Sequence, residues 1–152
     1  MDVIIPYDGQ SETIIFALRS IEKYFPCDKV YLVTSKTSGW MNQDNLIVLY
    51  HPDYHLTNKD ANLFDKVLYA LRAGAGEDFM FWSDDQILID QWNPVPVRNA
   101  RPPCQVEESC KWQRRMKRTG MFIKEKMGYE MPHNYDSHVP QPMKKALFEK
   151  IR

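Results

Sequence analysis

The chain has 152 residues, of which 43% are hydrophobic, and its 20 basic and 20 acidic side chains leave a formal net charge of zero. A chain of this length can form one domain with a hydrophobic core without needing disulfides, and its balanced charge gives no reason to expect a nucleic-acid partner. The three cysteines are an odd number, and no basic and apolar leader opens the chain, so we expect reduced thiols and a cytoplasmic protein. No segment approaches the roughly 20 apolar residues of a membrane-spanning helix, so no membrane span is expected.

The first half of the chain alternates strand patterns with helical ones. Strands are predicted over residues 3–7, 29–35, 45–50 and 79–82, and helices between Ser11 and Pro26 and over residues 60–73. Ser11 is expected to cap the first helix, and Gly74 and Gly76 end the second. This order predicts an α/β fold with a Rossmann-like, three-layer α/β/α arrangement around a mostly parallel sheet.

The pattern weakens after Ile89. Four prolines between residues 94 and 103 predict an irregular crossing around a basic stretch, and residues 107–127 predict a strongly charged helix that carries several lysine and arginine residues. A short extended segment is expected over 134–140, and a last helix over 144–152. The basic stretch could neutralise a diphosphate or meet a polyanionic acceptor, and a solvated helix face is the alternative.

The strand at 79–82 runs directly into Ser83, Asp84 and Asp85. In open α/β sheets, ligands bind in the crevice outside the carboxyl ends of the strands, and the same rule nominates Tyr7 and Asp8. Two adjacent carboxylates repel each other unless a cation lies between them, and Mg²⁺ or Mn²⁺ is commonly held by one or two carboxylates plus substrate phosphates. The alternative is a solvated turn between strands.

The first strand ends in Pro-Tyr-Asp and is followed by a helix, two strands, a second helix and the motif Phe-Trp-Ser-Asp-Asp. The order of these elements resembles that of the GT-A fold glycosyltransferases. In that family an Asp-x-Asp motif binds the nucleotide and its divalent metal ion. The resemblance makes Asp85 the metal-binding and catalytic acid and Asp84 the intervening position, while Ser83 stands where the family has its first acid. It implies a GT-A type sheet, a nucleoside-diphosphate-sugar donor, an unknown glycan, lipid or protein acceptor, and Mn²⁺ or Mg²⁺ as cofactor.

The resemblance nominates further nucleotide-sugar-binding residues in two segments. They are Pro6, Tyr7 and Asp8 at the end of the first strand, and Lys59, Asn62 and Lys66 at and along the second helix, besides Ser83 and Asp84. For Asn62 and Lys66 the alternative is a solvated helix face.

The last candidates lie in the second half of the chain. His138 resembles the late histidine that completes the metal site in many such enzymes, with an ordinary surface histidine as the alternative, and Asp136 is a candidate general base. Trp82 is expected in the core, and Trp92 is a candidate for contact with an acceptor sugar. We expect a single GT-A-like domain over 1–152, with a nucleotide-binding half at 1–89 and a reduced acceptor-side half at 90–152.

Two other functions compete with this interpretation. A nucleotidyltransferase would also hold metal-bound phosphates on such a sheet, but the loop after the first strand lacks the basic, glycine-rich sequence that suits a triphosphate. A zinc-stabilised binding module would use Cys104, Cys110, His133 and His138, although the five residues between the two cysteines exceed the usual spacing.

Overall fold

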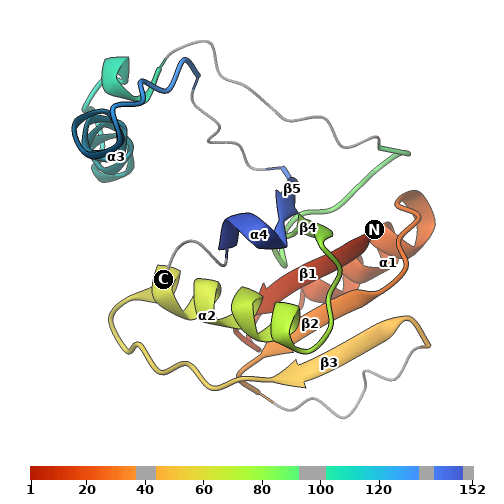
Figure 1. Cartoon of the computed structure of the whole chain (residues 1–152). Coiled ribbons are helices and arrows are strands. Elements are labelled where there is room, and N and C mark those ends of the chain that lie inside the picture. The colour runs from red at the N-terminus through yellow and green to blue at the C-terminus, as the bar shows by residue number, and fades with distance from the viewer. Residues whose placement is uncertain (37–43, 93–101, 134–138, 149–152) are drawn as a thin grey trace. The chain divides into compact units, whose positions relative to one another are not determined.

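The computed structural model describes residues 1–36, 44–92, 102–133 and 139–148 (Figure 1). The chain forms two compact units. The first comprises residues 1–95 and 139–152, and the second comprises residues 96–138. The first unit holds the sheet and the second holds the basic helix, and the single-domain organisation expected from the sequence stays a prediction.

A five-stranded sheet organises the first unit, in the order β3-β2-β1-β4-β5. Its strands are β1 (Asp2–Tyr7), β2 (Val30–Thr34), β3 (Leu46–Tyr50), β4 (Asp78–Phe81) and β5 (Gln141–Lys144). The strands β1 to β4 run parallel, and β5 is antiparallel to β4. The prediction of an α/β fold with a mostly parallel sheet is therefore confirmed, whereas β5 was not predicted.

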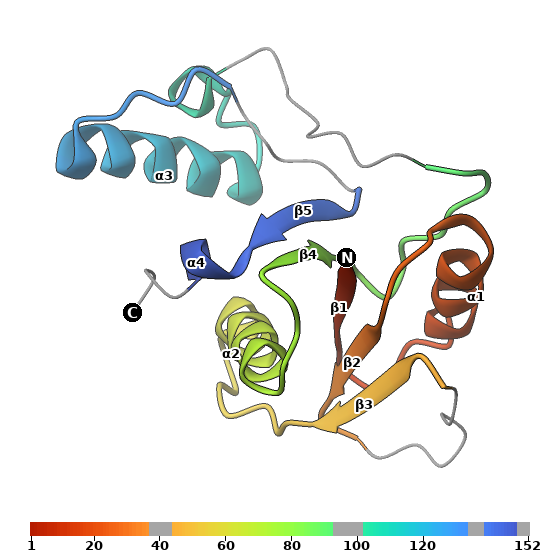
Figure 2. The ribbon, with the colours of Figure 1, turned by 45° about the vertical axis from the view of Figure 1, so that its right-hand side comes forward.

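Helices cover both faces of this sheet. Helix α1 (Ile14–Tyr24) and helix α2 (Lys59–Arg72) lie on opposite sides of it (Figure 2), and the short α4 (Lys145–Phe148) follows β5. Alternate residues of β1 point to opposite faces of the sheet. Val3 and Ile5 belong to the hydrophobic cluster that includes α1 residues, which we call the α1 core, and Ile4 belongs to the cluster that includes α2 residues. The structure thus has the three layers predicted from the sequence, and a separate hydrophobic cluster joins the sheet to the helix on each face.

The expected cap of the first helix is wrong. Thr13, not Ser11, is the N-cap residue of α1, and it makes no side-chain capping hydrogen bond. Ser11 lies two residues before Thr13, where its carbonyl accepts a hydrogen bond from the Tyr7 hydroxyl at 2.9 Å and its Oγ accepts one from the Thr13 backbone N–H at 3.3 Å, so it stabilises the turn before the helix. The second helix is capped by the side chain of Asn58, which accepts from the backbone N–H of Ala61 at 3.2 Å.

The second unit contains a short 3₁₀ turn, η1 (Pro103–Gln105), and the helix α3 (Lys111–Met127). The helix begins at Lys111 rather than at residue 107, and Gly128 ends it with the positive φ of 65° that glycine tolerates best. The last helix of the chain begins at Lys145 rather than 144. Most of the irregular crossing expected between Pro94 and Pro103, and most of the extended segment expected over 134–140, lie outside the described residues. Within the described part of the chain, no helix is long and apolar enough to cross a membrane.

Candidate functional site

The sheet has a topological switch point between β1 and β4. The chain places β2 and β3 on one side of β1, and then returns to place β4 on the other side. Connections that leave two neighbouring parallel strands in opposite directions open a crevice at their carboxyl ends, where ligands bind in folds of this kind. Asp8 follows β1 and the residues Ser83 to Asp85 follow β4, so both predicted acidic segments lie at this crevice.

A cavity of about 320 Å³ lies at the same edge, between the end of β1, the segment after β3 and helix α2. Its volume is at the lower end of the range of small-molecule sites. The predicted nucleotide-sugar-binding residues that line it are Pro6, Tyr7, Asp8, Lys59, Asn62 and Lys66. The structure therefore brings together the two segments that the sequence nominated separately.

Lys66 joins the two walls of this cavity. Its side chain is only 4% exposed, its Nζ donates a hydrogen bond to the carbonyl oxygen of Tyr7 at 2.9 Å, and it lies 2.8 Å from Oδ1 of Asp53. The alternative of a solvated helix face is therefore wrong for Lys66. An ammonium group has three donors, and two of them hold the end of β1 and the segment after β3 against α2.

Asp53 is a cavity residue that the sequence analysis missed. Burial raises the pKa of its carboxyl, but hydrogen bonds from Lys66 and Ser35 and the charge of Lys66 outweigh burial, so the pKa lies below its ordinary value. Asp53 is therefore the ionised partner of the buried lysine at neutral pH. It follows β3 closely, and the rule that nominated Asp8 at a carboxyl strand end applies to Asp53 as well.

Asn62 shapes the cavity wall through the backbone of His55. The side-chain Oδ1 of Asn62 accepts from the His55 backbone N–H at 2.8 Å, and its Nδ2 donates to the His55 carbonyl at 2.9 Å. The ring Nε2 of His55 lies 2.9 Å from Oδ2 of Asp65 on α2. The loop after β3 is thus fixed to α2, and the amide of Asn62 positions this loop.

We call Ser83, Asp84 and Asp85 the acidic turn. Its first residue is held by Gln86, whose side-chain oxygen accepts from the Ser83 backbone N–H at 3.0 Å. The indole of the buried Trp82 donates to the Gln86 carbonyl at 2.9 Å, and the Thr13 hydroxyl donates to the Asp84 carbonyl at 3.1 Å. The residue that follows β4 and the N-cap residue of α1 therefore fix the backbone of the acidic turn.

The acidic turn and the cavity form one electrostatic cluster. Burial, together with the negative charges of Asp8 and Asp85, raises the pKa of Asp84. Burial also raises the pKa of Tyr7, with contributions from Asp8 and Asp84. Asp8, which lines the cavity, therefore links it to the acidic turn, and a cation would relieve the repulsion among these carboxylates.

The carboxylates fit the oxygen ligands that Mg²⁺ and Mn²⁺ prefer, and a site of one or two carboxylates completed by substrate phosphates needs no more than Asp84 and Asp85. Among the residues that the structure describes, no group of three or more histidine, cysteine, aspartate or glutamate side chains is placed to hold a metal ion. The predicted ligand His138 and the predicted base Asp136 lie outside the described residues. Their roles stay predictions.

The aromatic and zinc candidates have other surroundings. Trp82 is fully buried, as expected. The half-buried Trp92 packs its ring 6.0 Å from that of Trp82 and 6.1 Å from that of Phe25, so the residue expected to meet an acceptor sugar lies against the α1 core. Of the zinc candidates, Cys104 and Cys110 are free thiols in the second unit.

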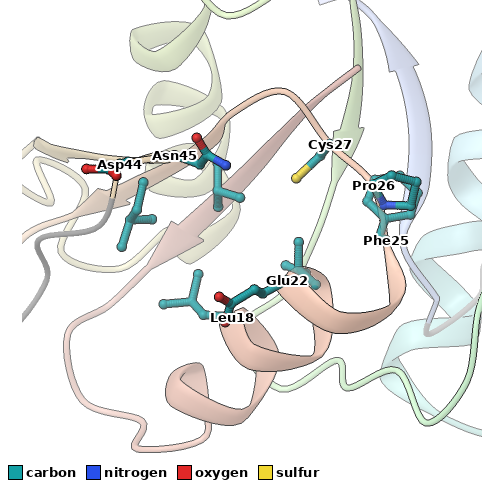
Figure 3. Close-up of a pocket in the computed structure, with 10 residues that line it drawn as sticks. Leu18, Glu22, Phe25, Pro26, Cys27, Asp44 and Asn45 are labelled. Atoms are coloured by element: carbon teal, nitrogen blue, oxygen red, sulfur yellow. The ribbon is translucent and has the colours of Figure 1, made fainter.

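A second, larger cavity lies at the opposite edge of the sheet. It has a volume of about 550 Å³ and is formed by the end of α1 and the segments that lead into β2 and β3, as Leu18, Cys27 and Asn45 show in Figure 3. None of the predicted site residues lines it. The sequence motifs therefore single out the smaller cavity at the carboxyl ends of the strands.

Comparisons with known proteins concern the fold alone. A scan against protein-family models gave no match, and neither did a search of curated proteins. Among solved structures, the mannosyltransferase PcManGT from Pyrobaculum calidifontis, in complex with GDP-Man and Mn²⁺, is similar with 19% identity and a TM-score of 0.43, over 59% of this chain and 28% of that one. S. aureus TarS 1–349 is similar with 18% identity and a TM-score of 0.42, over 82% of this chain and 32% of that one. This chain thus spans about a third or less of either structure.

Proposed function

We propose that this protein transfers a sugar from a nucleoside diphosphate sugar to an acceptor, with Mn²⁺ or Mg²⁺ as cofactor. One observation supports the proposal above all. Six residues nominated for nucleotide binding from two separate segments line one cavity, and one of them, Asp8, interacts electrostatically with Asp84 in the acidic turn. A nucleoside in the cavity would have its diphosphate beside this turn.

The residues of the cavity have distinct roles in this proposal. Tyr7 and Asp8 bound the nucleoside at the end of β1, and Lys66 keeps them in place through the Tyr7 carbonyl. Lys59 is exposed at the start of α2, where its ammonium group and the positive end of the helix suit the charge of a diphosphate. Binding and orientation of the donor are thus provided by the first unit.

The acidic turn, Asp85 above all, would hold the metal ion, with His138 as the further ligand that the family resemblance implies. When bound, the ion offsets the negative charge that grows on the departing diphosphate. If the reaction inverts the sugar's configuration, a general base must take the acceptor's proton, and Asp136 is the residue we propose for this step. A cytoplasmic location, which the sequence leads us to expect, belongs to the same proposal.

The first test is isothermal titration of uridine and guanosine diphosphates into the protein, with and without Mn²⁺. We expect metal-dependent binding of one nucleotide, and its loss in Asp85→Ala. The matched control is Asp44→Ala, which removes an exposed carboxylate at the second cavity, at the opposite edge of the sheet. Undiminished binding by Asp85→Ala, or an equal loss in the control, would contradict the assignment of the acidic turn.

A further inference from the structure

Helix α3 carries a concentration of positive charge that the proposed reaction does not use. Seven of its residues are lysine or arginine and one is glutamate, which leaves a net charge of +6 on a chain whose total is zero. The helix belongs to the second unit, whereas the proposed donor site belongs to the first. The sequence alone left a solvated face and a polyanion-binding face as alternatives for this segment.

Four of the seven cations fall in one row. With about 100° of rotation per residue, Lys111, Arg115, Arg118, Phe122 and Lys126 lie within an arc of roughly 80° on the helix surface. All five are exposed, and Phe122 is 59% exposed in the middle of the row. We call these five residues the basic stripe.

The opposite side of α3 packs within its own unit. Gly120 is buried there, and a Cβ atom built on it would lie 2.7 Å from Cβ of Pro103 in η1. Two other cations on that side have acidic partners, Lys117 with Glu108 at 2.9 Å and Lys124 with a second glutamate at 3.1 Å. The basic stripe is therefore the face of α3 directed away from η1.

One large apolar side chain, that of Phe122, lies within the stripe itself. By the same rotation, Trp112 lies roughly 80° from the centre of the stripe, Met121 roughly 100° and Met127 roughly 140°, so of these four exposed apolar residues Phe122 alone shares a face with the row of cations. An aromatic side chain among lysine and arginine residues suits a membrane surface, where the ring reaches the boundary between headgroups and acyl chains while the cations meet the headgroups. An RNA strand is the alternative partner, because it would satisfy the cations and could stack on the ring of Phe122.

We propose that the basic stripe docks this protein on the surface of a membrane rich in anionic lipids, with Phe122 inserted among the headgroups. The row of cations complements the negative surface potential, and the Phe122 ring moves from water into the apolar boundary region of the bilayer. The docking is peripheral, so it needs no membrane-spanning helix. It does not rest on the proposed sugar transfer, because no residue of the cavity or of the acidic turn takes part.

The test is co-sedimentation of the full chain with vesicles of phosphatidylcholine alone and of phosphatidylcholine mixed with phosphatidylglycerol. We expect binding to the mixed vesicles only, and weaker binding as salt is raised. The double variant Arg118→Glu with Lys126→Glu should weaken it by far more than tenfold, since each basic residue near an anionic surface accounts for about a fivefold change. The variant Phe122→Ser keeps the charge and should weaken binding several-fold through lost insertion.

The matched control is Arg19→Glu with Lys23→Glu, which makes the same change in net charge at two exposed positions of α1 in the first unit. It should keep most of the binding, and circular dichroism should show native helix content in every variant. The proposal is overturned if wild type ignores the mixed vesicles or if the control loses as much binding as the stripe variant. It is equally overturned if a single-stranded RNA oligonucleotide binds the stripe more tightly than the vesicles do.

Discussion

Replacement of Lys66 by methionine tests how the cavity is held together. Methionine keeps the length and the apolar stem of the side chain, so packing changes little. The variant removes the hydrogen bond to the Tyr7 carbonyl, worth about 1 kcal/mol, and the ion pair with Asp53, which adds at most about 1 kcal/mol because the Asp53 side chain is 36% exposed. We expect Lys66→Met to lower the free energy of unfolding by about 1–2 kcal/mol.

Urea unfolding followed by circular dichroism measures this change. The control is Lys59→Met, in the same helix and at the same cavity, where the side chain is exposed and the expected change stays within about 0.5 kcal/mol. Lys66→Met should also weaken nucleotide binding, because the end of β1 loses its tie to α2. A cost in Lys66→Met no larger than that in Lys59→Met would refute the role of Lys66 as a structural tie.

The pH dependence of the same variant has a definite sign. The folded state depresses the pKa of Asp53 below its ordinary value of 3.8, so the ion pair contributes stability that is fully present above that value and is lost as pH falls through the lower folded-state pKa. The difference in unfolding free energy between wild type and Lys66→Met should therefore shrink below about pH 4. A difference that stays constant down to strongly acidic pH would show that Asp53 takes no part.

Two further predictions concern the end of β1. Gly9 has a φ of 78°, and a Cβ atom on it would lie 2.7 Å from Cβ of Lys36, so Gly9→Ala should cost about 1–3 kcal/mol in urea unfolding. Gly9→Ala should lower the free energy of unfolding more than Gly74→Ala does, because φ is also positive at Gly74 but no atom lies within 4 Å of the added Cβ. Equal decreases would show that Lys36 moves away from the new Cβ without a cost. Asp8→Asn should lower the pKa of Asp84, measured by carboxyl NMR, because it removes a negative charge that now raises this pKa. An unchanged pKa of Asp84 would show that the charge of Asp8 in the cavity does not act on the acidic turn.

The parallel strands and the two helices that cover the sheet, α1 and α2, were predictable because their patterns are local. The strand β5 was not, because Gln141 to Lys144 contains a proline and shows no apolar alternation. It becomes a strand through pairing with β4, at a sheet edge where the missing N–H of Pro142 is tolerated. The capping position of α1 was also missed, since Ser11 and Thr13 are both suitable capping residues by type, and the contact of Ser11 with the Tyr7 hydroxyl is not visible in the sequence.

The candidate site shows the same division. Residue type and position at a strand end nominated Asp8 and the acidic turn, but helical periodicity left Lys66 undecided between solvent and ligand. Burial beneath the β1 end settles its place, and that burial depends on an acidic partner, Asp53, which lies 13 residues earlier and outside any motif. Sequence reasoning therefore identified the acidic residues at the crevice, but it missed Asp53, whose carboxylate neutralises the buried ammonium group of Lys66 in the cavity wall.

The register of the sheet explains why the cavity and the acidic turn act on each other. Ile4 pairs with Phe81, the last residue of β4, while β1 continues to Tyr7. The chain that leaves β4 therefore turns beside the free end of β1, and the hydrogen bond from Thr13 to the Asp84 carbonyl keeps it there. Because of this placement, a change of charge at the cavity must alter the affinity of the acidic turn for protons, and for any cation bound at the turn. A ligand in the cavity and a cation at the turn should consequently bind with reciprocal coupling, whichever nucleotide the cavity accepts.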